Sequence, residues 1–287
     1  MEESDLIESA AAYTKRLLNQ GARARKSLGQ NFLIDDGVIQ NIVNMSDLGP
    51  SAPVVEIGAG LGVLTRVLAG QVEHLWAVEL EEAKVKILER ELADLPVTIF
   101  KGDALELDLH TLWGEEQGVL IGNLPYYITS PLLMHFLEQS ENLRQMTVMV
   151  QKEVADRLGA VPGGKAYGVL SVAVQLAAEV EKLFDVPPHA FRPQPKVTSA
   201  VVRLKLRPYP NLAVEKHQLL LVVKAAFSQR RKTLGNSLSA GLGADKSKVR
   251  ELLESVGIDE GRRAETLSIE EFQEITRAWI DLLTIYN

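Results

Sequence analysis

The chain has 287 residues, of which 46% are apolar and 24% charged, and its formal net charge is −7. This length accommodates one domain of about 200 residues and a smaller second one, and the composition is that of an ordinary globular protein. Cysteine is absent, which excludes disulfide bonds, thiolate catalysis and a zinc site with cysteine ligands. The acidic N-terminus and the lack of a long apolar run argue against a secretory signal or a membrane span, so we expect a cytoplasmic protein.

From residue 53 onward, short β-type runs alternate with helical stretches, after an N-terminal extension at 1–30. Alternation of this kind predicts βαβ crossovers and a mostly parallel sheet, in a domain that we expect to cover residues 1–207. The expected strands are residues 54–57, 75–79, 97–100, 119–121, 146–150 and 200–206.

Three glycines, Gly58, Gly60 and Gly62, follow the first of these strands and lead into a helix. Glycine lets the backbone approach a ligand closely at a strand-to-helix turn, although a plain tight turn would have the same composition. The third glycine comes one residue too early for the dinucleotide pattern G-x-G-x-x-G. Together with the lack of a catalytic His or Tyr/Lys constellation, this argues against an NAD-dependent dehydrogenase.

Acidic residues follow the next two strands. Glu79 closes the second strand, 21 residues after Gly58, where a carboxylate can accept hydrogen bonds from both ribose hydroxyls. Asp103 follows the third and could accept from an adenine amino group, or act as a helix N-cap. Because no basic phosphate clamp accompanies them, a nucleoside without phosphates fits better, and S-adenosylmethionine is such a ligand.

The sequence Asn123-Leu124-Pro125-Tyr126 falls at the end of the fourth strand, where ligands bind in open α/β sheets. An adenine N6 amine is a poor nucleophile because its lone pair is delocalised into the ring. The Asn123 side-chain oxygen and the Leu124 carbonyl could accept from both of its N–H groups and free that lone pair. Pro125 restricts the preceding residue, and Tyr126 offers a ring to stack on the base. Such a reaction needs neither a metal nor a strong general base.

Basic residues are concentrated late in the chain. Residues 188–250 hold thirteen Lys and Arg against two acidic residues, a local balance of +11 that leaves −18 for the remainder. A basic segment on an acidic protein favours a polyanionic partner, although a solvated helix face would give the same count.

Two prolines within residues 207–211 predict a linker to a second, helical domain at 212–287. Ser268 and Glu271 fit a capping box that opens its last helix. The expected helices are residues 215–228, 230–240, 246–256 and 268–284.

Taken together, these motifs resemble those of one family, the ribosomal RNA adenine N6-dimethyltransferases, and within it the branch that acts on bacterial 16S rRNA. The likeness runs from about residue 25 to beyond 270. It includes the glycine-rich loop, Glu79, Asp103 and the Asn-Leu-Pro-Tyr motif. Four further segments match as well: Ser27-Leu-Gly-Gln-Asn-Phe-Leu33, Val150-Gln-Lys-Glu-Val-Ala-Asp-Arg157, Phe191-Arg-Pro-Gln-Pro-Lys-Val197 and Phe227-Ser-Gln-Arg-Arg-Lys-Thr-Leu234.

The resemblance implies a Rossmann-like class I S-adenosylmethionine-dependent methyltransferase, with a mostly parallel seven-stranded sheet flanked by helices and a small all-α C-terminal domain that binds RNA. The implied reaction is dimethylation of two adjacent adenosines in a loop near the 3′ end of 16S rRNA, during 30S subunit biogenesis. A loop is a suitable substrate because its bases can be unstacked into a pocket. The expected enzyme is monomeric, needs no metal, has no membrane partner, and acts on the 30S subunit or its precursor.

Particular residues receive roles from the resemblance. Phe191 would stack on the second face of the target base, and Asn31 and Leu33 would line the methionine end of the cofactor. The implied cofactor contacts are Asn31, Leu33, Gly58, Gly60, Glu79, Asp103 and Asn123. The basic run Arg230, Arg231 and Lys232 would track rRNA phosphates.

Two related functions stay open as alternatives. The sister enzyme that methylates a 23S rRNA adenine and confers antibiotic resistance shares the cofactor motifs, but residues 229–232 and the region around Phe191 favour the small-subunit branch. A ribosome-assembly factor that has lost catalysis could keep the fold, and the intact Asn123, Glu79 and Asp103 oppose it.

Overall fold

The computed structural model of the chain describes residues 8–25, 29–49, 51–208 and 212–286. The chain forms two compact units, Met1–Ala155 with Glu179–Arg207, and Asp156–Ala178 with Pro208–Asn287. The expected division had a single boundary at 207–212, whereas Asp156–Ala178 packs with the C-terminal helices because Val172 and Leu176 share their apolar core. Residues 209–211 of the expected linker lie outside the described residues.

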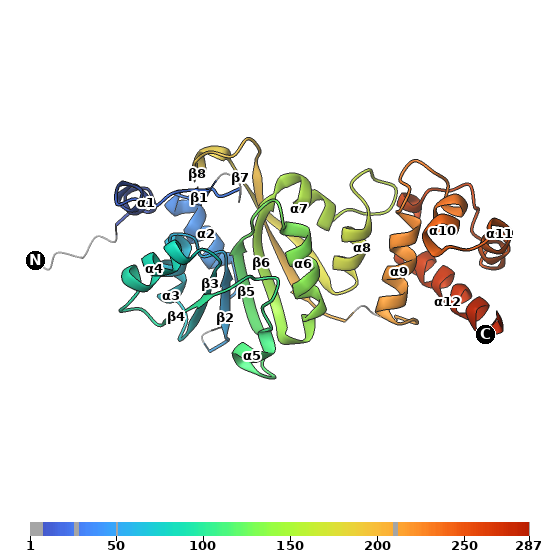
Figure 1. The fold of residues 1–287 in the computed structure, drawn as a ribbon, viewed down its shortest axis with the longest axis horizontal. Helices are drawn as coiled ribbons and strands as arrows, with labels where there is room; N and C mark the ends of the chain where they lie inside the picture. The colour runs from blue at the N-terminus through green and yellow to red at the C-terminus, as the bar shows by residue number, and fades with distance from the viewer. Residues whose placement is uncertain (1–7, 26–28, 50, 209–211, 287) are drawn as a thin grey trace, which may run out of the picture. The chain divides into compact units, whose positions relative to one another are not determined.

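The first unit is built on a seven-stranded sheet with the order β4-β3-β2-β5-β6-β9-β7 (Figure 1). The pairs among β2, β3, β4, β5 and β6 are parallel, and β9 runs antiparallel to β6. This confirms the predicted mostly parallel sheet. The strands are β2 (Val54–Ile57), β3 (Leu75–Glu79), β4 (Val97–Lys101), β5 (Gly118–Asn123), β6 (Leu143–Gln151), β7 (Ala178–Val186) and β9 (Ser199–Leu206).

The burial of the two central strands, β2 and β5, accounts for their apolar sequences. Every residue of β2 is buried, as are the first five of β5, and a strand covered on both faces needs a continuous apolar run. They also approach closely, since a Cβ on Gly122 would lie 2.6 Å from the Ile57 carbonyl oxygen. Glycine at position 122 therefore permits the pairing of Gly122 with Ile57.

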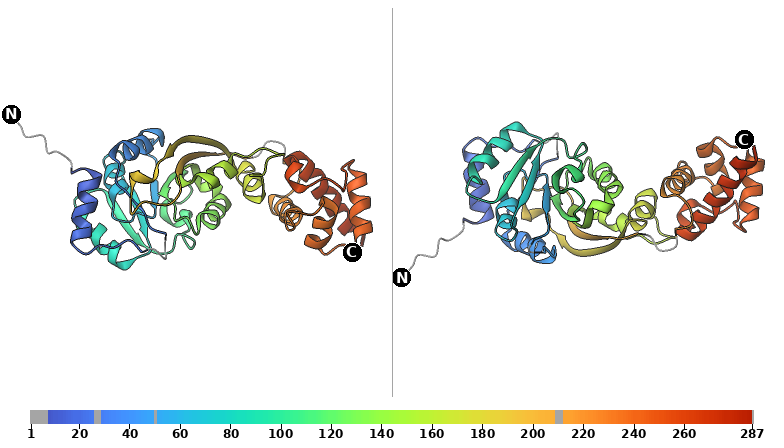
Figure 2. Two further views of the ribbon diagram at one scale, coloured as in Figure 1. Left: turned by 90° about the horizontal axis from the view of Figure 1, so that it is seen from above. Right: turned by 90° about the horizontal axis from the view of Figure 1, so that it is seen from below.

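Helices lie on both sides of this sheet (Figure 2). Side chains from α1, α2 and α3 share one apolar core with Val54, Leu75, Val119 and Ile121 of the sheet. The helices of this unit are α1 (Ala10–Asn19), α2 (Asp36–Met45), α3 (Val63–Ala69), α4 (Glu82–Glu91), α5 (Leu109–Trp113) and α6 (Thr129–Glu138). A second, two-stranded antiparallel sheet pairs β1 (Phe32–Leu33) with β8 (Phe191–Arg192).

The strand order creates one point at which the chain reverses direction across the sheet. From β2 the chain moves outward to β3 and β4, then returns to β5 on the other side of β2 and continues to β6. At such a switch point the adjacent loops leave in opposite directions and open a crevice at the carboxyl ends of the strands. The fold therefore provides a ligand site between β2 and β5.

The second unit is helical and has its own core, in which Phe272 and Leu253 are fully buried. The predicted capping box is confirmed, because Ser268 N donates to Glu271 and Glu271 N donates to Ser268 Oγ. The expected helix at 230–240 begins later, at Leu234, because residues 229–232 form a turn and Thr233 takes the N-cap position. Its helices are α7 (Lys152–Leu158), which spans the boundary, α8 (Val169–Gln175), α9 (Lys216–Ala226), α10 (Leu234–Leu242), α11 (Lys246–Ser255) and α12 (Ile269–Tyr286).

Within the described ranges, none of the helices combines the length and the apolar character that crossing a bilayer requires.

Candidate active site

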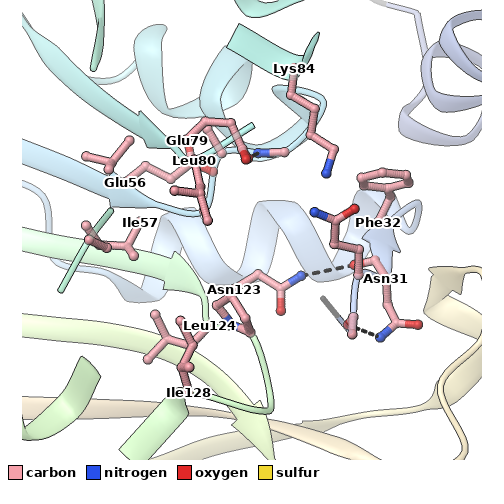
Figure 3. Close-up of a pocket in the computed structure, with 18 of the residues that line it drawn as sticks. Asn31, Phe32, Glu56, Ile57, Glu79, Leu80, Lys84, Asn123, Leu124 and Ile128 are labelled. Atoms are coloured by element: carbon pink, nitrogen blue, oxygen red, sulfur yellow. Dashed lines mark hydrogen bonds between the residues drawn. The ribbon is translucent and has the colours of Figure 1, made fainter. Parts of the chain in front are cut away.

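A pocket opens at the carboxyl ends of β2 to β5 (Figure 3), and all of its lining residues fall between Gly29 and Leu132. It therefore belongs wholly to the first unit. Ten residues that the sequence singled out line it together: Asn31, Leu33, Gly58, Gly60, Glu79, Asp103, Asn123, Leu124, Pro125 and Tyr126.

The glycine loop after β2 needs its glycines. Gly58, Gly60 and Gly62 have φ values of 77°, 61° and 83°, in the left-handed region that side chains with a Cβ rarely adopt. A Cβ on Gly58 would also lie 3.4 Å from the Asn123 carbonyl oxygen. The buried Tyr13 of α1 donates from its hydroxyl to the Leu61 carbonyl at 3.0 Å and so braces the loop from behind. The loop thus presents backbone atoms rather than side chains to the pocket.

Glu79 is held firmly at the end of β3. Its Oε2 accepts from the Gly60 N–H and its Oε1 from the Glu81 N–H, both at 2.9 Å. Only 6% of the residue is exposed. Each carboxylate oxygen can accept a second hydrogen bond, so the group remains an acceptor for a pair of hydroxyls.

Asp103 is not a helix N-cap, because the next helix begins only at Leu109; its expected contact with an adenine amine stays a prediction. It lines the pocket after β4, and its Oδ1 accepts from the Leu105 N–H at 2.9 Å. That bond fixes the turn in the manner of a cap and leaves Oδ2 for a ligand.

Asn123 is held in position through both its backbone and its side-chain amide. Its backbone continues from β5, and the next residue, Leu124, donates from its N–H to the Met149 carbonyl at 3.1 Å. Its Nδ2 donates to the Asn31 carbonyl at 3.2 Å, and Figure 3 shows the amide pointing toward Asn31. With Nδ2 engaged in this way, Oδ1 is the end of the amide that remains free to accept.

The turn after Asn123 is fixed as well. The Pro125 carbonyl accepts from the Ile128 N–H at 3.1 Å and from Thr129 Oγ1 at 3.0 Å. The Tyr126 hydroxyl lies 2.6 Å from Ser199 Oγ of β9. Burial raises the pKa of Tyr126, so the phenol stays neutral and its ring is anchored at the edge of the pocket.

The pocket also contains a buried carboxyl that the sequence did not single out. Glu56 in β2 is 2% exposed, and its Oε2 has no hydrogen-bond partner among the described residues. The pKa of Glu56 is raised to about 7, mainly by burial and to a smaller extent by the neighbouring charge of Glu79.

Lys84 is the one basic residue among those that line the pocket, and its amino group is paired with Glu81. Arg25 Nε also contacts Glu81, at 2.7 Å, and Gln30 Nε2 donates to it. Although burial opposes it, the hydrogen bonds from Lys84 and Gln30 hold the pKa of Glu81 below its usual range. Sequence reasoning missed this cluster; the Glu81/Lys84 spacing of three in a helical stretch was the only local signal for it.

Four predicted residues lie outside the pocket. Phe191 pairs with Leu33 across β8 and β1 but is 1% exposed and belongs to the apolar core. Its ring, as placed, is covered, so stacking on a base would require β8 to move. Arg230, Arg231 and Lys232 are exposed on the turn between α9 and α10 of the second unit, where Arg230 donates to the Lys165 carbonyl. Among the described residues, no cluster of His, Asp and Glu is suited to a metal ion.

The chain is similar to known proteins along most of its length. Residues 21–281 match the sequence model of a family described as ribosomal RNA adenine dimethylase. The chain is 64% identical over 272 residues to the ribosomal RNA small subunit methyltransferase A of Desulfitobacterium hafniense, covering 95% of this chain and 98% of that protein. It is 46% identical to the protein of the same name from Alkaliphilus metalliredigens, over 89% of this chain and 91% of the relative.

Solved structures show the same fold. A dimethyladenosine transferase from Plasmodium falciparum superposes with a TM-score of 0.73 at 22% identity, covering 87% of this chain and 97% of that one. The 23S rRNA methyltransferase ErmE superposes with a TM-score of 0.64 at 26% identity, covering 86% and 99%. The expected Rossmann-like class I methyltransferase fold, with its mostly parallel seven-stranded sheet and helical C-terminal part, is confirmed.

Proposed function

The chain belongs to the ribosomal RNA adenine dimethylase family, and on that premise we propose that it transfers methyl groups from S-adenosylmethionine to N6 of two adjacent adenosines near the 3′ end of 16S rRNA. Dimethylating both adenosines takes four transfers. The observation that supports this most is the position of Asn123 and Leu124, at the end of β5 and beside the glycine loop.

The pocket residues fit S-adenosylmethionine. Gly58 and Gly60 leave room for backbone approach, and Glu79 retains acceptor capacity for ribose hydroxyls. Lys84 lines the pocket, but its pairing with Glu81 removes it as a phosphate clamp, which favours a nucleoside over a nucleotide. The bound cofactor supplies an electrophilic methyl group on a sulfonium. Asn31 and Leu33 would line its methionine end, and Asp103 Oδ2 would accept from its adenine amine.

The chain's contribution to the reaction is to orient and activate the target amine. Asn123 Oδ1 and the Leu124 carbonyl would each accept one N–H of the adenine N6, localising its lone pair for attack. Fixed acceptors of this kind need no reorganisation during the reaction, which is how preorganised groups accelerate it. The turn bonds at Pro125 and the anchored Tyr126 ring would hold the base in register. The proton leaves after the amine becomes cationic, so no strong general base is required.

The rRNA partner would be bound partly through charge. Arg230, Arg231 and Lys232 are exposed on one turn, and three neighbouring cations would give RNA binding a steep salt dependence. We assign the 30S subunit or its precursor as the partner, a monomeric state, and a cytoplasmic location that follows from work on ribosomal subunits. The 64% identity to a small-subunit methyltransferase against 26% to a 23S rRNA methyltransferase favours 16S over 23S rRNA.

The test is methyl transfer from radiolabelled S-adenosylmethionine to 30S subunits that lack these methyl groups. We expect label in N6,N6-dimethyladenosine after nuclease digestion, and none with subunits that are already methylated. Absence of transfer to 30S subunits, with efficient transfer to 23S rRNA, would refute the small-subunit assignment. Absence of transfer to either RNA, with S-adenosylmethionine still bound, would favour the non-catalytic assembly factor.

A further inference from the structure

Glu81 lies next to the pocket, and its contacts lead both to Glu79 and to Asn123. Glu81 occupies the N-cap position of α4, two residues after the end of β3, and its side chain is 9% exposed. Three donors from two separate segments converge on it: Lys84 from α4, and Arg25 and Gln30 from the segment before β1. The carboxylate joins the two segments through these contacts. Losing it would leave the amino group of Lys84, whose side chain is 4% exposed, buried without this partner, whereas Arg25 is 64% exposed and its ion pair contributes less.

Glu81 is linked to Glu79 through its backbone. The Glu81 backbone N–H donates to Glu79 Oε1 at 2.9 Å, while the Gly60 N–H holds the other oxygen. The conformation of the Glu81 backbone thus sets the orientation of the carboxylate that would bind the ribose.

Glu81 is also linked to Asn123, through the residues Gln30 and Asn31 that precede β1. Gln30, which donates to Glu81, is followed by Asn31, and the Asn31 carbonyl accepts from Asn123 Nδ2 at 3.2 Å. The Arg25 N–H donates to Gln30 Oε1 at 2.8 Å, so both residues held by Glu81 are also held to each other. The Asn31 carbonyl is therefore kept where it fixes which end of the Asn123 amide faces the pocket.

We infer that Glu81 is a positioning residue for the methyl transfer: by holding Arg25 and Gln30, it keeps the Asn31 carbonyl on Asn123 Nδ2 and so directs Asn123 Oδ1 at the target amine. This inference rests on the proposed function. It explains why a pocket for a ligand without phosphates is lined by Lys84, which pairs with Glu81: the pair belongs to the orientation of Asn123 rather than to recognition of a phosphate.

The adjacent residue provides a matched control. Glu82 also forms ion pairs with two lysines, Lys86 at 3.3 Å and Lys101. It lies in the first turn of α4, next to the N-cap residue Glu81. Its side chain, however, is 51% exposed, and among the described residues its carboxylate pairs with Lys86 and Lys101 rather than with Arg25 or Gln30. Glu81→Gln and Glu82→Gln therefore remove the same charge from neighbouring positions, and only the first change loosens the Asn31 segment.

The experiment compares the two variants in activity and in the NMR signals of the Asn123 side-chain amide. Those signals are identified by their disappearance in Asn123→Asp. We expect Glu81→Gln to lower kcat roughly 10- to 100-fold with KM for the 30S subunit unchanged, because small displacements of catalytic groups have effects of that size. The Asn123 amide signals should shift or broaden. Glu82→Gln should stay within about twofold of the unmodified chain, as expected for an exposed ion pair.

The amide signals keep this test separate from the proposed function, because they do not depend on any RNA being methylated. If the Asn123 signals and kcat of Glu81→Gln equal those of Glu82→Gln, the inference is wrong. If instead Glu81→Gln lowers kcat only in proportion to a loss of folded protein in thermal unfolding, while the Asn123 signals of the folded fraction are unchanged, the role is structural and the inference is also wrong.

Discussion

The pocket beside β2 and β5 and the basic turn at residues 229–232 hold their polar side chains in opposite ways. In the pocket, Glu79 accepts from two backbone N–H groups and the Asn123 amide is fixed by a carbonyl. On the turn, Arg231 and Lys232 are exposed and form no ion pair within the described residues. A reaction needs fixed geometry, whereas attraction to a polyanion needs charge that can adapt, and the difference shows which region is suited to each.

The strongest test of this contrast between the pocket and the basic turn is the substitution Asn123→Ala. If fixed geometry in the pocket carries the reaction, kcat should fall roughly 100- to 1,000-fold, the loss typical of removing one preorganised electrostatic contact. Binding of S-adenosylmethionine, followed by calorimetry, should change little, because Glu79 and the glycine loop stay in place. A variant that keeps a tenth or more of the activity would show that Asn123 does not activate the amine.

A second prediction concerns the cost of burying a carboxyl in the pocket. The pKa of Glu56 is raised to about 7, so the folded chain keeps a proton that the unfolded chain releases above about pH 4.5. Its contribution to stability is complete below pH 4.5 and is lost as the pH rises through about 7. The unmodified chain should therefore lose about 3 kcal/mol of unfolding free energy across that range from this group.

Glu56→Gln should remove this loss. Denaturant unfolding at pH 5 and pH 8 should show the variant gaining stability relative to the unmodified chain only at the higher pH. Glu89→Gln, at an exposed position of α4, is the control and should leave the pH dependence unaltered. An equal change for Glu56→Gln at both pH values would mean that the pKa of Glu56 is not raised in the folded state.

The smallest expected effect concerns the basic turn at residues 229–232. Arg231→Glu should weaken 30S binding about tenfold at moderate salt and reduce the slope of log K against log [salt] by about 1 to 2, since a phosphate contact is lost and repulsion is added. The affinity for S-adenosylmethionine should stay constant. Arg277→Glu makes the same charge change on an exposed residue of α12 and should leave the salt slope nearly unchanged. Equal effects of the two substitutions would assign RNA attraction to net charge rather than to the turn.

Sequence reasoning was most accurate where pattern and burial coincide. The strands expected at 54–57 and 75–79 match β2 and β3 residue for residue, because central parallel strands need continuous apolar runs. β1 and β8 were missed, since two-residue strands have no periodicity and exist only through pairing between Phe32 and Arg192 and between Leu33 and Phe191. The start of α10 was placed four residues early because the basic turn has the composition of a helix.

The pocket residues divide along the same lines. Glu79, Asp103 and Asn123 could be found because each lies at or just after the end of a strand, and the ends of parallel strands meet at one edge. Glu81 and Tyr13 could not, because their partners, Arg25, Gln30 and Leu61, are brought to them only by folding. Phe191 was expected beside a base and is instead buried in the core.

Gly122 shows how far the requirements of the reaction extend beyond the residues that meet a ligand. A methyl group there would lie 2.6 Å from the Ile57 carbonyl and would force β5 away from β2, moving Asn123, the next residue, with it. In a library of all single substitutions selected for activity, position 122 should therefore tolerate glycine alone. It would score as catalytic, although it has no side chain with which to take part.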